Sequence, residues 1–183
     1  MDRPGPSGDT CRGWLDAAMS AGTHAESGLT KSVWSDADFD VMGWHDATVH
    51  GLCVQPAASD DALPRLLLDL DYIVRWVHPV APETHFSFWI APSTLAFDDV
   101  WDVEGDLDFK GTALSLDIDH LRRSTPEDPR GGPRWHLEGH SFDLTFRAAG
   151  FHQYMRRPPR FSPRLVLTPA GRGGLSFTET GFV

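Results

Sequence analysis

Two short segments of this sequence carry histidine and carboxylate side chains at spacings that could bind a divalent metal ion. The first contains His45, Asp46 and His50. On an extended strand Asp46 and His50 share one face but lie roughly 13 Å apart, so a bulge or a loop end must bring them together. Converging imidazole and carboxylate groups could act as metal ligands or as an acid–base pair. The alternative is that these side chains are structural or simply exposed.

The second segment contains His136, Glu138 and His140. On a straight strand His136 and Glu138 share a face, whereas a tight hairpin in which Gly139 supplies a positive φ folds His140 back toward its neighbours. Either geometry brings two of the three groups together. A catalytic metal centre needs at least three protein ligands and an open position. The six residues of the two segments therefore define one hypothesis, a metal-dependent enzyme on a small β-barrel.

A third segment, residues 150–160, combines aromatic side chains with three arginines. We single out Phe151, Tyr154, Arg156 and Arg157, because aromatic residues and arginine are enriched at binding surfaces. The planar guanidinium group also pairs well with carboxylate or phosphate. The segment therefore predicts a surface for a protein partner or another ligand. The alternative is that the two aromatic rings cover the core while the arginines pair with acidic strands.

Carboxylates also recur at alternate positions of three further segments. They are Asp102, Glu104, Asp106 and Asp108, together with the pairs Asp69/Asp71 and Asp117/Asp119. Clustered oxygens suit Ca²⁺ or Mg²⁺, but side chains along one strand diverge from a common centre. We therefore expect a solvated outer face, which would discourage aggregation through a sheet edge.

The elements that position these residues are predicted to be strands, because the apolar residues alternate with period two. In residues 65–77 the even positions are apolar, while Asp69, Asp71 and Arg75 lie at odd positions. Residues 101–109, 114–119 and 142–148 repeat this alternation. Shorter strands are expected at 47–54, 85–90, 94–97, 134–138, 164–168 and 175–178. The pattern predicts a mainly antiparallel β-sandwich or open β-barrel with little helix.

The chain is expected to form a single β-rich domain over residues 33–183. Residues 1–32 are rich in glycine, serine, threonine, alanine and aspartate, a composition typical of a disordered extension. The sequence has neither the apolar stretch of a signal peptide nor an apolar run long enough to span a membrane, so we expect a cytoplasmic location. The strand order and the oligomeric state do not follow from the sequence.

The formal net charge of -10 argues against general binding to nucleic acid or to anionic membranes. The charge is unevenly distributed. Residues 36–119 contain seventeen acidic and three basic residues, whereas residues 120–183 contain five acidic and ten basic ones. The acidic residues of the first part could pair with the basic residues of the second part across the sheet. Alternatively, they could present an acidic face to a basic partner.

Three strings give the chain a resemblance to a group of small uncharacterised bacterial proteins. They are Gly43-Trp44-His45-Asp46, the run Leu68 to Ile73 with Trp76, and Gly150-Phe151 with Tyr154. The resemblance covers residues 42–178. It implies no activity or ligand that could be transferred to this chain.

Phosphate-binding loops, dinucleotide fingerprints, the Gly-x-Ser-x-Gly elbow and paired Cys-x-x-Cys motifs are all absent from the sequence. The leading hypothesis is therefore a non-enzymatic binding or protein-interaction domain without a cofactor. The metal-dependent enzyme is the alternative, with a divalent metal as its cofactor. A third hypothesis is a small-ligand carrier whose cavity is lined by Trp76, Trp89, Trp101 and Trp135.

Overall fold

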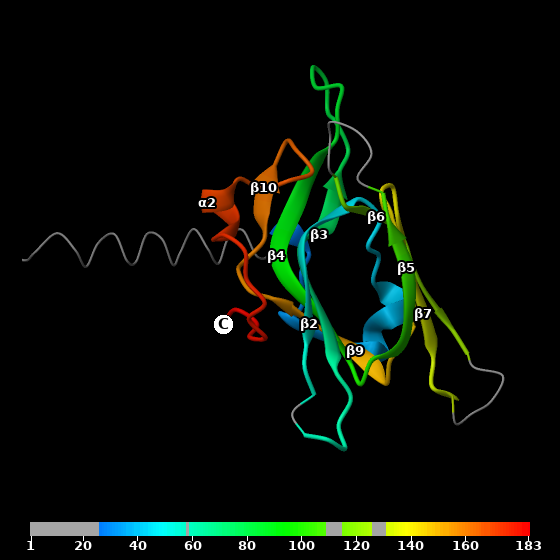
Figure 1. Cartoon of the computed structure of the whole chain (residues 1–183). Coiled ribbons are helices and arrows are strands. Elements are labelled where there is room, and N and C mark those ends of the chain that lie inside the picture. Colours follow the sequence, from blue (N-terminus) through cyan, green and yellow to red (C-terminus); the bar gives the residue numbers. More distant parts are fainter. Residues whose placement is uncertain (1–25, 58, 109–114, 126–130) are drawn as a thin grey trace, which may run out of the picture.

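The computed structural model describes residues 26–57, 59–108, 115–125 and 131–183 (Figure 1). The first 25 residues of the predicted extension lie outside this part of the chain. The strands are β1 Val33–Ser35, β2 Ala47–Gln55, β3 Arg65–Val77, β4 Ser87–Asp98, β5 Trp101–Leu107, β6 Asp117–Ser124, β7 Arg134–Gly139, β8 Phe142–Arg147, β9 Gly150–Met155 and β10 Arg160–Ser162. A 3-10 helix, η1 (Asp36–Val41), and a short helix, α2 (Pro169–Arg172), complete the described elements.

All strand pairings are antiparallel, which confirms the predicted fold class of a mainly antiparallel β protein with little helix. The order is β1-β9-β4-β3-β2-β6-β7-β8-β5, and β10 pairs with the remaining part of β4. The two outermost strands of this order do not pair, so the sheet stays open. The paired residues of β2 and β6 are Ala47–Ile118 and Thr48–Asp117, and the sheet folds over at this short junction (Figure 1).

The core fills the inside of the folded sheet with aromatic side chains. Phe97, Trp135, Phe146 and Phe151 come from four different strands, and each is at most 1% exposed. Their rings meet edge to face, with centroids 4.7 Å apart for Phe97–Phe146 and 5.7 Å apart for Trp135–Phe151. Phe39 of η1 packs against Trp135 of β7 and Phe151 of β9. Such edge-to-face packing adds to the free energy of area burial.

β3 and β4 are buried on both faces, because the chain after β10 covers the side of the sheet away from the core. The expected solvated face is therefore wrong at Asp69 and Asp71, both of which are 0% exposed. It is correct for β5, where Asp102 and Asp106 are exposed. Periodicity cannot distinguish these cases, since a polar residue on an outer face is buried whenever a later segment covers it.

The β7–β8 hairpin forms where the sequence predicts it, but its geometry differs from the expectation. The turn residues are His140 and Ser141, and Gly139 pairs with Phe142 as the last residue of β7. Gly139 does not adopt a positive φ. Its missing side chain instead makes room for the Phe142 ring and the backbone oxygen of Asp117.

Candidate functional site

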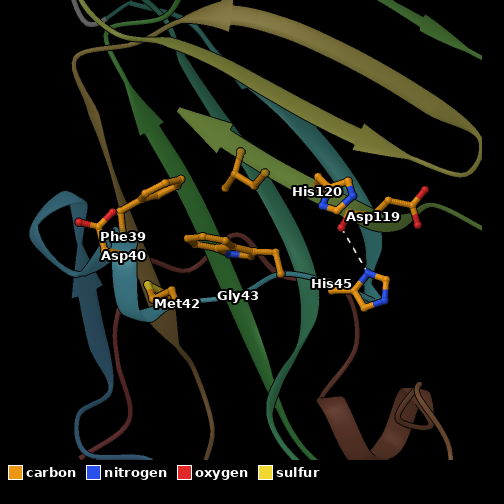
Figure 2. Close-up of a pocket in the computed structure, with 9 residues that line it drawn as sticks. Phe39, Asp40, Met42, Gly43, His45, Asp119 and His120 are labelled. Carbon is orange, nitrogen blue, oxygen red and sulfur yellow. Dashed lines mark hydrogen bonds between the residues drawn. The ribbon is translucent and has the colours of Figure 1, made fainter. Parts of the chain in front are cut away.

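A concave site that carries titratable side chains lies between the η1–β2 connection and β6. It is a cavity of about 330 Å³. Figure 2 shows Phe39, Asp40 and Met42 on one side and His45, Asp119 and His120 on the other. Gly43, Trp44 and Leu121 complete the lining. We call this cavity the histidine pocket.

The connection before β2 is held in place by the buried side chain of Trp44 and by the backbone of Asp46. Trp44 is buried, and its indole N–H donates a hydrogen bond of 2.7 Å to Oε1 of Gln153 in β9. Asp46 has a φ of 61°, a left-handed conformation that aspartate tolerates better than most residues. Its backbone N–H donates to the carbonyl of Ile118 at 2.8 Å. Together these contacts leave His45 exposed beside β6.

The imidazole of His45 stacks on that of His120, with ring centroids 6.4 Å apart and an interplanar angle of 23°. Nδ1 of His45 lies 3.3 Å from the carbonyl oxygen of Asp119, the contact drawn in Figure 2. Because a carbonyl only accepts, Nδ1 carries the proton in this contact, and Nε2 of a neutral ring is left as an acceptor. Nε2 is 3.8 Å from Oδ2 of Asp46.

A continuous row of aromatic rings extends from the pocket across the ends of β3 and β4. It consists of His120, His45, Trp76, Phe86, Phe88 and His78. Trp76 stacks on His45 at 6.4 Å and meets Phe86 edge to face at 5.6 Å. Trp76 and Phe86 are 38% and 40% exposed. This aromatic row therefore offers a partly solvated apolar surface next to the pocket, of the kind that marks binding sites.

The charge around the pocket is negative. Asp40 and Asp119 line the cavity, and no lysine or arginine does. Asp46 lies beside His45. The nearest described cation to Asp40 is Arg123, at 3.9 Å, but Arg123 makes its closer ion pair with Asp36, at 2.8 Å. Ring faces are also electron-rich, so the pocket and the aromatic row together favour a cationic group.

The structure separates the six residues of the metal hypothesis. Of the six, only His45 lines the histidine pocket, and Asp46 lies beside it. β2 does contain a bulge between Val49 and Gly51, but His50 there approaches Asp71, with Nε2 3.1 Å from Oδ2. Nε2 of His50 has no hydrogen-bond partner among the described residues, so its contact with Asp71 is electrostatic.

The other three residues of that hypothesis lie on or beside β7. Nε2 of His136 is 2.9 Å from Oδ2 of Asp143, Glu138 pairs with Arg122, and His140 lies in the turn. Among the described residues no three histidine, cysteine or acidic side chains lie together as a metal site. The geometry therefore gives the metal hypothesis no ligand set to build on.

The four residues singled out in the arginine segment lie in different environments. Phe151 is a core residue, and Tyr154 is half-buried on β9. Burial, reinforced by the negative charges of Glu179 and Asp98, raises the pKa of the Tyr154 hydroxyl. Arg156 is largely buried against Asp69. Of the four, only Arg157 is exposed.

A buried ionic cluster ties the C-terminal segment to the outer face of β3. Nη2 of Arg172 is 2.6 Å from Oδ1 of Asp69, and its Nε is 3.2 Å from Oδ1 of Asp71. Nη2 of Arg156 approaches the same Oδ1 of Asp69 at 2.5 Å. Backbone N–H groups of Leu167 and Ser176 donate to Asp71 and Asp69, each at 2.9 Å.

The ionic cluster keeps Asp71 charged. Burial alone would raise the pKa of Asp71, but the contact with His50, the N–H of Leu167 and the charge of Arg172 together hold it below its ordinary value. Burial likewise disfavours the charged form of Arg172, but Asp69 and Asp71 outweigh it and raise the pKa. Through these paired charges the cluster acts as a tether between β3 and the C-terminal segment.

Sequence reasoning identified only part of this site. It singled out His45, Asp46 and Arg156, and its alternative that the arginines pair with acidic strands holds for Arg156 and Asp69. It did not single out His120, Phe86 or Arg172. His120 gave no signal, because nothing local indicates that β6 pairs with β2. Asp69 and Asp71 were visible as an alternating pair, and their burial depends on residues that follow β9.

The four tryptophans of the carrier hypothesis do not surround one cavity. Trp135 is fully buried in the core, Trp89 packs on Phe161, and Trp101 lies against Gly132. Trp76 belongs to the exposed aromatic row. Their positions therefore do not define an interior binding chamber.

The described part of the chain has no helix that is both long and apolar enough to cross a membrane. No family model, no curated protein and no solved structure matches this chain. Its function is therefore inferred from the geometry and charge of its own side chains.

Proposed function

We propose that this chain is a non-enzymatic binding domain that recognises a lysine- or arginine-rich segment of a protein partner. The binding surface is the histidine pocket together with the aromatic row. One observation carries this proposal. A row of exposed rings opens onto a pocket whose lining contains two carboxylates and no lysine or arginine.

The chemistry of the surface matches a long cationic side chain. An ammonium or guanidinium group over the face of Trp76 gains about 0.5–1 kcal/mol at an exposed site, and more when water is excluded. Its aliphatic stem can lie along Phe86, while the charged end reaches Asp119 or Asp46. The net charge of -10 adds long-range attraction for a basic partner and increases its association rate.

The test is a calorimetric titration of the protein with a hexa-arginine peptide, with a hexa-glutamate peptide as the charge control. We expect binding of the arginine peptide only. The informative variant is Phe86→Ala, which removes an exposed ring of the row. It should weaken binding by about three- to tenfold, because the stem loses its apolar support.

The matched control is Phe161→Ala on β10, which removes a ring of similar exposure, 55% against 40%, outside the row. It should leave the affinity unchanged. Equal losses in the two variants would mean that the peptide binds by net charge alone. That outcome, or no preference for the arginine peptide, would overturn the proposal.

A further inference from the structure

A second cavity, of about 260 Å³, lies on the outer side of the sheet between the end of β9 and the C-terminal segment. In Figure 1 this segment runs from α2 along the side of β4 that faces away from β5 and β7. The lining consists of Arg156, Arg157, Arg172, Gly173, Ser176, Thr178, Thr180 and Gly181. It shares no residue with the histidine pocket.

The lining is cationic. It contains three guanidinium groups and no carboxylate. Arg156 and Arg172 are held in place by Asp69 and Asp71 beneath them, which neutralise two of the three charges. Glu179, the acidic residue closest in sequence, turns away to form a two-point ion pair with Arg65, at 2.7 and 2.6 Å. One positive charge is therefore left at the cavity.

That charge belongs to Arg157. Its guanidinium lies against the backbone of Gly173, where a Cβ atom would overlap it. Gly173 has a φ of 83°, so it ends α2 in a left-handed conformation and lets the guanidinium approach closely. Within the described ranges Arg157 has no carboxylate within ion-pair distance and no hydrogen-bond acceptor. The N–H donors of this guanidinium therefore make no hydrogen bond in the described part of the chain, although its contact with Gly173 fixes its position.

Hydroxyl groups surround the same cavity. Oγ of Ser176 lies 2.9 Å from Oγ1 of Thr178, and the backbone N–H of Thr178 donates to that Ser176 oxygen at 3.2 Å. Thr180 adds a third hydroxyl. A guanidinium fork next to several O–H donors is complementary to an anion with three or more oxygens.

We propose that this cavity binds a phosphate group, with Arg157 and the hydroxyls of Ser176 and Thr178 as its donors. The buried Asp69–Arg156–Arg172 arrangement holds the lining rigid, so little side-chain entropy is lost on binding. The cavity is larger than a phosphate ion, and it therefore accommodates a phosphate carried by a small organic group. This second site is independent of the basic-peptide surface.

The test is an NMR titration of the full chain with inorganic phosphate at low ionic strength. In the wild type we expect amide shifts at residues 157 and 173–181. Arg157→Ala should weaken binding by at least about tenfold, because a charge-assisted contact is lost. Thr178→Ala should weaken it by a smaller factor. Neither side chain contributes to the ionic cluster, so both variants should keep the wild-type amide spectrum elsewhere.

The matched control is Arg160→Ala, which removes an exposed arginine three residues away that does not line the cavity. Its phosphate affinity should equal that of the wild type. Equal weakening in Arg157→Ala and Arg160→Ala would show a general charge effect and overturn the site. Wild-type protein without saturable binding below about 10 mM phosphate would also overturn it.

A second titration with phenyl phosphate identifies the source of the phosphate. Tighter, Arg157-dependent binding of phenyl phosphate supports an organic phosphate monoester as the ligand. Equal, Arg157-dependent affinity for both compounds supports a site for the phosphate group alone. Binding of phenyl phosphate that survives Arg157→Ala would contradict the proposed donors.

Discussion

At the scale of single residues, the most consequential side chains are the two aspartates of β3. Asp69 and Asp71 are buried, but each accepts hydrogen bonds from a backbone N–H and lies next to a guanidinium. A buried charge is tolerated only when it is paired in this way. These residues therefore connect the sheet to the C-terminal segment, and removing one partner leaves the others uncompensated.

The substitution Asp71→Asn should lower the free energy of unfolding by about 3–5 kcal/mol. Arg172 and His50 would then lose the negative charge that Asp71 places beside them in a site that excludes water. Urea denaturation of both proteins measures the difference. The control is Asp106→Asn on exposed β5, which should change stability by less than about 0.5 kcal/mol. Similar values for the two variants would contradict the role assigned to the ionic cluster.

The same aspartate predicts a pH dependence. The pKa of Asp71 is lower in the folded protein than its ordinary value of 3.8, so folding favours the ionised form. This contribution to stability is present in full above pH 3.8 and is lost as the pH falls below that value toward the folded pKa. Urea titrations from pH 6 downward should show a steeper acid loss for the wild type than for Asp71→Asn. Parallel curves would rule out this contribution.

At the scale of elements, β4 shows how tertiary context overrides a local signal. Pro92 divides the segment into two expected strands, at 85–90 and 94–97, because proline lacks the N–H that a central strand needs. The structure has one strand there. β10 pairs with β4 up to Ile90 and β9 pairs from Ser93, so Pro92 lies between the two partners. Its carbonyl accepts from the N–H of Arg156 at 2.9 Å.

The C-terminal segment shows the opposite case. Residues 164–168 and 175–178 alternate weakly and predict strands, but neither forms one in the structure. Backbone N–H groups of this segment bond to Asp69 and Asp71 instead of to a neighbouring strand. The segment is thus ordered by side-chain carboxylates, an interaction that no period in the sequence reveals.

The element-scale prediction concerns Gly139 at the end of β7. Gly139→Ala should destabilise the protein by about 1–3 kcal/mol, because the added Cβ collides with the Phe142 ring and the backbone oxygen of Asp117. Gly43→Ala is the matched control, since nothing lies within 4 Å of a Cβ at that position. Thermal denaturation should therefore separate the two alanine variants. An unchanged melting temperature for Gly139→Ala would show that the end of β7 relaxes enough to accommodate the added methyl group.

At the scale of the whole molecule, much of the charge asymmetry is resolved by pairing within the fold. Arg147 lies 3.5 Å from Asp102, and Arg134 lies 3.5 Å from Glu104. Basic residues of the second half of the chain therefore neutralise acidic residues of β5. Arg65 similarly joins Asp98 to Glu179. This is the first of the two alternatives that the charge distribution leaves open. The negative surface left over includes the histidine pocket.

The net charge also predicts how binding of the hexa-arginine peptide responds to salt. Its affinity should fall as sodium chloride rises from 0.05 to 0.5 M, because screening shortens the reach of the molecule's negative field. The fold-loss caused by Phe86→Ala should stay nearly constant, since ring contacts are short-range. Titrations at several salt concentrations measure both trends. A Phe86→Ala effect that disappears with salt would contradict a direct contact with the ring.

By itself, the sequence determined the antiparallel β class and most strand positions, because alternation and turn residues act over a few neighbouring positions. It also marked His45, Asp46 and Arg157 as side chains with usable chemistry. Only the tertiary structure decided what these residues meet. Arg172 reaches Asp69 across 103 positions of the chain, and His45 meets His120 only because β2 pairs with β6. Such contacts depend on strand order, and strand order is set by how the whole core packs rather than by any local pattern.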